Sequence, residues 1–267
     1  MGVIEILSSR REYTKLNPLV VLLGKGDHQI TSSWIDSDEQ DEDDEQFEYE
    51  TTLEITRNNI TFVGKGKDTT TILGGFRIDD LENITFKNMT VTNTSDNGCG
   101  IHMRNAKVEL IDVAFSGCGQ ASLFITESIF ENTVVATRCE FSYSRGYGAL
   151  VEGSLTSATF KNCVFNDNKY DGIAGSDQST IHLHGEATAI HSNGGDGIYA
   201  DSAKVIIHLP SHHNTSYNNG GDDRVTRAGG VITNVEYSSG RGTGGGVGHG
   251  HTTRYGWGPD GTWFSGR

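Results

Sequence analysis

The sequence predicts an all-β solenoid whose coils are each about 24 residues long, within the range known for repeat architectures. The stretch DGIA at 171–174 returns as DGIY at 196–199. The stretch NITF at 59–62 returns unchanged at 83–86. A fixed period in the twenties, with one or more strands in each repeat, is typical of a solenoid.

Short strands, not helices, are expected within each repeat. Apolar residues alternate with polar ones, as in the pairs Ile181/Leu183 and Val205/Ile207, instead of recurring every three or four residues. The chain has 35 glycines and only 3 prolines. Gly, Asn and Asp are therefore expected to make the turns, because they adopt positive φ readily.

Aromatic and sulfur-containing residues also recur at the coil length. Phe115, Phe141 and Phe165 each lie about one coil apart in the sequence and should stack on neighbouring strands, about 4.8 Å apart. Cysteines follow the same spacing, and their pattern is not that of a zinc site. We interpret them as stacked core thiols that form no disulfides: Cys99, Cys118, Cys139 and Cys163.

The order of segments along the chain follows from where the repeat begins and ends. Residues 1–17 form an N-terminal lead or cap, and residues 18–235 form the solenoid, beginning with a buried strand at 18–23. A loop at 36–50 is inserted into the first coils. Residues 236–267 form a tail rich in Gly, His and aromatic residues, which we expect to be flexible.

Most of the net charge belongs to the inserted loop. The formal charge is −14, but residues 36–50 contain 10 acidic side chains, which leaves 25 acidic against 21 basic residues and a net of −4 elsewhere. No basic stripe predicts nucleic-acid binding. The loop lacks the ligand spacing of a calcium-binding loop, so we expect a solvated insertion. We expect no cofactor. Calcium binding stays an alternative, although no motif supports it.

Membrane and export signals are not evident in the sequence. No apolar run approaches the length of a membrane-spanning helix, so no membrane span is expected. The first residues, MGVIEILSSRREY, lack the basic and then apolar pattern of a signal peptide. The default expectation is therefore a cytoplasmic protein, although the sequence leaves the compartment open.

Repeats of this length, built from strand, Asn/Gly turn and strand, resemble the pectin-lyase-like superfamily. The segment at 59–75, NITFVGKGKDTTTILGG, is similar to the N-terminal coil of many members. The segment at 181–224 resembles a group of β-helix proteins from single-celled algae and related protists, whose activity is not established. The resemblance implies a single-stranded right-handed parallel β-helix from about 18 to 235.

Catalytic motifs of the superfamily's enzymes do not carry over to this chain. The pectin methylesterase pattern is partly echoed by GQA at 119–121, but its two following aspartate motifs are missing. The polygalacturonase order of Asn-Thr-Asp, Asp-Asp, Gly-His-Gly and Arg-x-Lys is not reproduced, and the Asp-Pro-His of alginate epimerases is absent. The resemblance thus implies the fold and leaves the chemistry open.

Alternation along the strands that follow the Asp/Gly turns predicts two outward rows, each a line of side chains one coil apart. The first row is His102, Phe124, Leu150, Ala174 and Tyr199. The second row is Arg104, Thr126, Glu152, Ser176 and Asp201. We interpret His102, Phe124 and Tyr199 as candidate ligand-binding residues, because aromatic faces can stack on sugar rings.

The second row holds the candidate catalytic residues Arg104, Glu152 and Asp201. Glu152 and Asp201 are two coils apart, so about 10 Å, which is just beyond the range for an inverting hydrolase. We therefore favour a scaffold that binds a carbohydrate or protein partner on an outward strand face. The alternative function is that of a polysaccharide-active lyase, hydrolase or epimerase. The simplest interpretation of the two rows is an ordinary solvated sheet face without a function of its own.

A group of histidines forms a further candidate. His184 and His208 are one coil length apart at outward positions and should stack directly, with Lys161 one coil below. Two stacked imidazoles could bind a metal or supply a base. No carboxylate partner is evident, so we expect a structural ladder and no metal site. Other histidines lie near in the sequence: His182, His191, His212 and His213.

Overall fold

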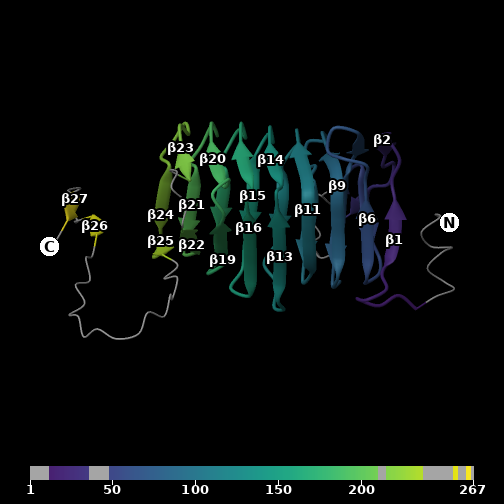
Figure 1. The fold of residues 1–267 in the computed structure, drawn as a ribbon, viewed down its shortest axis with the longest axis horizontal. Coiled ribbons are helices and arrows are strands. Elements are labelled where there is room, and N and C mark those ends of the chain that lie inside the picture. Colours follow the sequence, from purple (N-terminus) through teal and green to yellow (C-terminus); the bar gives the residue numbers. More distant parts are fainter. Residues whose placement is uncertain (1–11, 36–47, 210–214, 237–254, 258–262, 266–267) are drawn as a thin grey trace, which may run out of the picture. The chain divides into compact units, whose positions relative to one another are not determined.

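The computed structural model describes residues 12–35, 48–209, 215–236, 255–257 and 263–265. Every regular element among these residues is a β-strand, and the main unit is a parallel β-solenoid of about seven turns with about 24 residues per turn. Figure 1 shows its strands side by side along the solenoid axis. The predicted all-β solenoid is thus confirmed. Within the described part of the chain, no helix is long and apolar enough to cross a membrane.

One strand of each turn belongs to a sheet of eight parallel strands, which we call sheet A. Its strands are β5 (Thr52–Ile55), β8 (Gly75–Asp79), β10 (Ile101–Arg104), β12 (Ala121–Ile125), β15 (Tyr147–Val151), β18 (Ile173–Gly175), β21 (Ile198–Asp201) and β24 (Arg224–Arg227). Each of them pairs with the equivalent strand of the next turn, in this order along the axis.

The rest of each turn belongs to a sheet of fifteen strands, sheet B. Its first half contains β1 (Leu19–Leu22), β6 (Ile60–Val63), β13 (Asn132–Thr137), β16 (Thr156–Lys161), β19 (Thr180–His184), β22 (Lys204–Leu209) and β25 (Val231–Glu236). Its second half contains β2 (Gly26–Gln29), β7 (Thr70–Leu73), β14 (Glu140–Ser142), β17 (Val164–Asn166), β20 (Ala189–His191) and β23 (Ser216–Tyr217).

Two long strands, β9 (Ile84–Thr92) and β11 (Lys107–Ser116), run through both halves of sheet B. Each bends at a residue with positive φ, Asn88 in β9 and Asp112 in β11. In the following turns Arg138 and Asn162 have the same backbone conformation and lie between separate strands. Asn and Asp are tolerated at such corners because their short side chains bond locally.

The strand register confirms the predicted ladders. Ile84 pairs with Ile60 on one side and with Val108 on the other. The rings of Phe115 and Phe141 stack with centroids 5.2 Å apart, and those of Phe141 and Phe165 at 4.6 Å. These buried rings and the aliphatic rows beside them form one continuous core inside the solenoid.

The four cysteines are free, buried thiols, as the ladder interpretation expects. Burial raises the pKa of Cys99 to about 12 and that of Cys118 to about 11. Cys139 and Cys163 contact each other, and burial together with this contact raises the pKa of Cys139. Protonated, buried thiols are poor nucleophiles, so Cys99, Cys118 and Cys139 serve as core residues.

A ladder of asparagines, buried at Asn168 and Asn193 and half-buried at Asn219, lies at the corner that leads into sheet A. Asn168 Nδ2 donates to Asn193 Oδ1 at 2.9 Å, and Asn193 Nδ2 donates to Asn219 Oδ1 at 2.9 Å. In the earlier turns Ser122 and Ser144 bond to each other inside the solenoid. The sequence analysis assigned asparagines to turns in general and missed this internal network.

At the N-terminal end the strand predicted at 18–23 is only half buried, which corrects the expectation of a buried strand. Leu19 is buried, whereas Val20 and Leu22 are 49% and 72% exposed. β1 pairs with β6 in parallel and no described strand lies on its other side, so it is an edge strand of sheet B.

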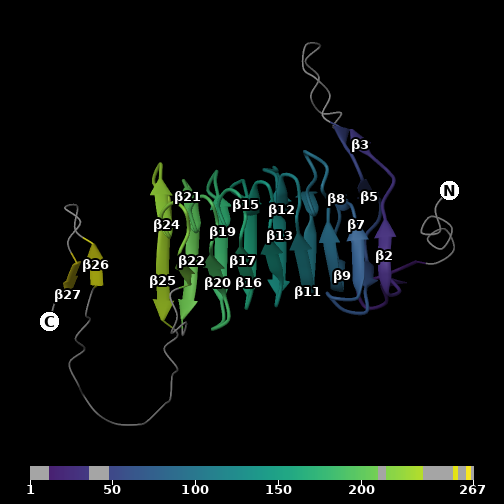
Figure 2. The same ribbon diagram turned by 90° about the horizontal axis from the view of Figure 1, so that it is seen from above.

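The acidic insertion is bounded by two short antiparallel strands, β3 (Trp34–Ile35) and β4 (Glu48–Tyr49). In Figure 2, β3 lies beside β5 of sheet A, which agrees with their contacts. Residues 36–47 of the predicted 36–50 loop lie outside the described residues.

The chain divides into two units, Met1–Tyr237 and Ser238–Arg267. In the second unit β26 (Tyr255–Trp257) and β27 (Trp263–Ser265) pair as antiparallel strands. The other residues of the tail, whose flexibility stays a prediction, lie outside the described part.

Candidate functional site

The outward face of sheet A, which we call face A, brings the predicted rows together. His102 pairs in register with Phe124, Phe124 with Leu150, Leu150 with Ala174, and Ala174 with Tyr199. The row continues to Arg77 at one end. The inward residues between them are buried, as predicted: Ile101, Met103, Leu123, Ile125, Ala149, Val151, Ile173, Ile198 and Ala200.

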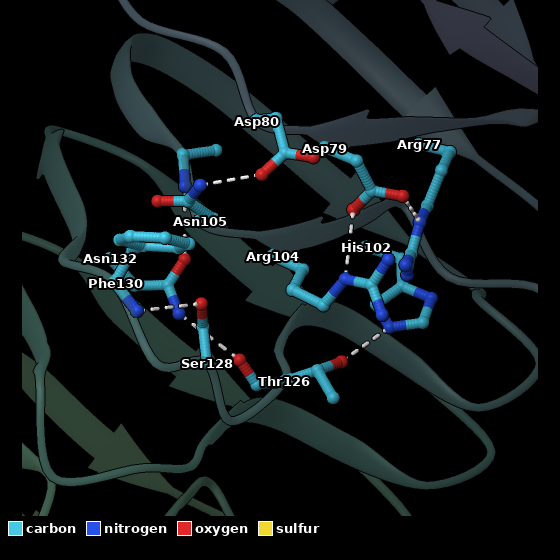
Figure 3. Close-up of polar contacts among 11 residues, drawn as sticks. Arg77, Asp79, Asp80, His102, Arg104, Asn105, Thr126, Ser128, Phe130 and Asn132 are labelled. Carbon is cyan, nitrogen blue, oxygen red and sulfur yellow. Dashed lines mark hydrogen bonds and ion pairs between the residues drawn. The ribbon is translucent and has the colours of Figure 1, made fainter. Parts of the chain in front are cut away.

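The N-terminal end of face A carries a buried charge cluster (Figure 3). The Arg77 side chain is only 2% exposed, and its Nε lies 2.6 Å from Asp79 Oδ2. Arg104, predicted as a candidate catalytic residue, lies with its Nε 3.9 Å from Asp79 Oδ1. Burial raises the pKa of Asp79, while Arg77 and Arg104 oppose that rise. Arg104 is therefore already engaged by a carboxylate.

Trp34, on β3 next to the acidic insertion, covers this cluster. The Arg77 guanidinium lies 4.3 Å from the centroid of the Trp34 ring, and the Trp34 ring meets the His102 ring edge-on. His102 is consequently buried, although it occupies the outward row. The sequence could not show this cover, because Trp34 lies outside the repeat.

His102 supports its neighbours rather than facing solvent. Its ring stacks on Phe124 with centroids 4.6 Å apart, and its Nε2 lies 2.5 Å from Thr126 Oγ1. Burial lowers the pKa of His102, and the charges of Arg77 and Arg104 lower it further. The neutral, buried imidazole of His102 therefore packs against one side of the Phe124 ring.

A hollow of about 380 Å³ adjoins the cluster. It is lined by Asp80, Arg104, Asn105 and the loop 127–130. Asn105 donates to Asp80 on one side of the hollow, and Asn132 Nδ2 donates to the Thr126 carbonyl, which joins the two ends of the loop (Figure 3). The loop exposes Phe130 at its tip. The sequence analysis missed this hollow because the loop does not follow the repeat.

Beyond the cover of Trp34, face A presents a partly exposed apolar line. Phe124, Leu150 and Tyr199 are half-buried, and the small Ala174 lies between Leu150 and Tyr199. The Arg227 guanidinium lies 5.9 Å from the centroid of the Tyr199 ring. The line therefore combines the rings of Phe124 and Tyr199 with Leu150 and the buried Ala174 between them.

Beside this line runs the second outward row. Glu152 is half-buried, and burial raises its pKa, with Asp177 and Glu127 adding to the rise. Asp201 follows two strands further along, because Val151, Gly175 and Ala200 are in register. Glu152 and Asp201 are thus about 10 Å apart by strand spacing, just beyond the separation of the paired carboxylates in an inverting glycoside hydrolase.

The predicted histidine stack lies on sheet B, away from face A. The rings of His184 and His208 are parallel within 9°, with centroids 3.9 Å apart, and Lys161 pairs in register with His184. His182 is a third member, since its Nδ1 lies 2.9 Å from His208 Nε2. The sequence analysis noted His182 only as a neighbour. His212 and His213 lie outside the described residues.

A larger hollow, of about 490 Å³, also opens on sheet B, near the N-terminal end of the solenoid. Lys15, Lys87 and Lys107 are among the residues that line it. Lys107 Nζ is held between Glu82 and Glu131 at 3.1 and 3.2 Å. These carboxylates neutralise the lysine, so the hollow carries less positive charge than its lining suggests.

Comparison with known proteins places the chain by fold. The family model described as "Right handed beta helix region" matches residues 46–188. The A-module of the mannuronan C-5 epimerase AlgE6 from Azotobacter vinelandii is 12% identical, with 82% of this chain and 76% of that chain covered and a TM-score of 0.43. A pectin methylesterase solved with a hexasaccharide is 11% identical, with 89% of each chain covered and a TM-score of 0.45.

A protein of Geobacillus virus E2, ORF18, is 9% identical, with 82% of this chain and 54% of that chain covered and a TM-score of 0.41. A comparison with curated proteins finds no match. Nothing in these findings supports the expected likeness to algal and protist proteins. Identities this low also say nothing about the activity of this chain.

Proposed function

The chain belongs to the right-handed β-helix family, and from that premise we propose that it binds a carbohydrate on face A. The observation that carries the proposal is the partly exposed line of Phe124, Leu150 and Tyr199 beside the polar row of Glu152 and Asp201. Flat rings next to hydrogen-bonding side chains suit a sugar, which has apolar ring faces and polar edges.

The charge of the face favours a neutral glycan. Glu152 lies close enough to Asp177 and Glu127 for their charges to raise its pKa. A polymer of uronic acids would meet like charges in this part of the face, and that repulsion costs binding energy. Carboxylates accept hydrogen bonds from hydroxyl groups, which neutral sugars supply in abundance.

The test measures binding of the full chain to soluble neutral and acidic polysaccharides by affinity electrophoresis. Tyr199→Ala and Phe124→Ala should each weaken binding by about 5-fold or more, since stacked aromatic contacts are often worth more than about 1 kcal/mol. Tyr217→Ala is the matched control, because Tyr217 is a half-buried aromatic on sheet B. Equal loss in the control and the face A variants would overturn the proposal.

A second candidate function is cleavage of a polysaccharide, favoured by the raised pKa of Glu152. A carboxyl group with a raised pKa can act as a general acid. Incubation with the same polymers, followed by size-exclusion and by ultraviolet absorbance of unsaturated uronide, distinguishes the two functions. Shortening that Glu152→Gln abolishes would establish the enzyme. Binding without shortening supports the carbohydrate-binding proposal, whereas the absence of both binding and shortening would point to a protein partner.

A further inference from the structure

We propose that His182, His184 and His208 form a binding site for one divalent transition-metal ion on the outward face of sheet B. The proposal is independent of carbohydrate binding, because these residues belong to β19 and β22 of the other sheet. It also goes beyond the sequence analysis, which expected a structural ladder.

The strand geometry places three imidazoles at one point. His182 and His184 are two residues apart on β19, so their side chains leave the same face. β22 pairs with β19 in parallel, and this register puts His208 beside His184. One ligand nitrogen from each residue lies within 4.8 Å of the others. A tetrahedral ion with metal–nitrogen bonds of about 2.0–2.1 Å needs nitrogens about 3.3 Å apart.

Small movements bring these nitrogens to a metal. His182 Nδ1 and His208 Nε2 are already 2.9 Å apart. The His184 ring is parallel to that of His208, so it must rotate about χ2 to direct its lone pair at the same ion. That torsion is broad in histidine, and all three side chains are half-buried with one side open to solvent.

The ligand atoms and their charged neighbours indicate the class of metal. Among the described residues, Lys161 on β16 and Lys204 on β22 are cations near the three histidines, and the exposed Glu186 follows β19. β25, on the other side of β22, contributes the neutral Thr233 and Val235 beside the row. An all-imidazole set suits Zn²⁺, Cu²⁺ or Ni²⁺, whereas Ca²⁺ and Mg²⁺ prefer oxygen ligands.

Three protein ligands leave a tetrahedral ion with one open position, as in catalytic zinc sites. That position would face solvent, because the three histidines lie on an outward strand face. Lys161, next to His184, would favour an anion as the fourth ligand. The site would thus bind a metal together with water or a small anion.

The experiment titrates Zn²⁺ into the full, untagged chain after treatment with a chelator, in competition with a chromophoric indicator. We expect one ion per chain, with affinity lowered at least about 10-fold in each of His182→Ala, His184→Ala and His208→Ala. The matched control is His191→Ala, because His191 lies half-buried on β20 and stacks on Tyr217. This control should bind as the wild type does.

Co²⁺ provides a second measurement, since its visible spectrum reports the number and geometry of the ligands around the ion. Circular dichroism and thermal melting verify that each variant folds, and His208→Gln replaces any alanine variant that does not. Absence of stoichiometric binding, binding unchanged in the three variants, or displacement of Zn²⁺ by equimolar Ca²⁺ would each overturn the proposal.

Discussion

The indole ring of Trp34 lies edge-on to the imidazole of His102, with ring centroids 6.3 Å apart and an interplanar angle of 87°. Trp34 belongs to β3, which bounds the acidic insertion, whereas His102 belongs to the repeat. This contact closes the N-terminal end of the first outward row, so the accessible part of face A begins at Phe124.

Removal of this cover should change the ionisation of His102 and the stability of the solenoid. In Trp34→Ala, less burial should bring the pKa of His102 closer to its usual value, because burial is the main cause of its lowering. Loss of the cation–π contact with Arg77 should cost about 1–2 kcal/mol of unfolding free energy. Nuclear magnetic resonance titration of the imidazole and urea unfolding measure the two effects. An unchanged titration would contradict the role given to Trp34.

The Arg77–Asp79 ion pair should be strongly coupled, since Arg77 is almost fully buried. Asp79→Asn leaves the guanidinium without its carboxylate and should cost about 3–5 kcal/mol of unfolding free energy. Arg77→Met leaves Asp79 half-covered and should also destabilise the fold. The double variant should lose much less unfolding free energy than the two single variants lose together, as a double-mutant cycle measured by urea unfolding would show. Additive losses would mean that the two side chains act independently.

The repeat itself explains how much could be predicted. Because Phe115, Phe141 and Phe165 recur at the length of one coil, their stacking and the register of the inward rows follow from counting residues. The position of Trp34 over His102 cannot be found in this way, because β3 lies outside the repeat. The hollow beside Arg104 was likewise missed, since the loop that carries Phe130 departs from the period. His182 was not included in the predicted histidine stack, because the strand register pairs it with Ile206 and not with a histidine.

The asparagine ladder should be essential for stability. Asn193 Oδ1 accepts from Asn168 Nδ2, and Asn193 Nδ2 donates to the Phe165 carbonyl at 3.2 Å. Asn193→Ala leaves these buried groups without hydrogen-bond partners. It should lower the unfolding free energy by about 2–4 kcal/mol, because each unsatisfied buried group costs about 1–3 kcal/mol. Asn234→Ala, at an exposed position on β25, should change the unfolding free energy by less than about 0.5 kcal/mol. Urea unfolding compares the two variants, and similar losses would argue against the ladder's role.

Carbohydrate binding on face A should weaken in acid through Glu152. The carboxylate form accepts hydrogen bonds from hydroxyl groups, and burial raises the pKa of Glu152. Binding should therefore begin to weaken at a higher pH than an ordinary glutamate would allow. Glu152→Gln should weaken binding at neutral pH by about 10-fold, the worth of a hydrogen bond to a charged group, and should flatten the pH profile. Glu109→Gln, an exposed position on sheet B, serves as the control. If the pH dependence of binding were unchanged in Glu152→Gln, another ionisable group would have to cause it.

The histidine site should make the metal-free protein less stable in mild acid. The pKa of His184 is about 4 in the folded chain and should return to about 6.5 on unfolding, so the unfolded chain binds more protons between these values. The unfolding free energy contributed by His184 is therefore fully present above about pH 6.5 and falls as the pH approaches 4. Its slope stays below about 1.4 kcal/mol per pH unit, because the ring is partly exposed to solvent. His184→Gln should flatten the profile in this window, measured by urea unfolding in the presence of a chelator, whereas His191→Gln should leave it unchanged. An identical pH dependence in wild type and His184→Gln would show that folding does not shift the pKa of His184.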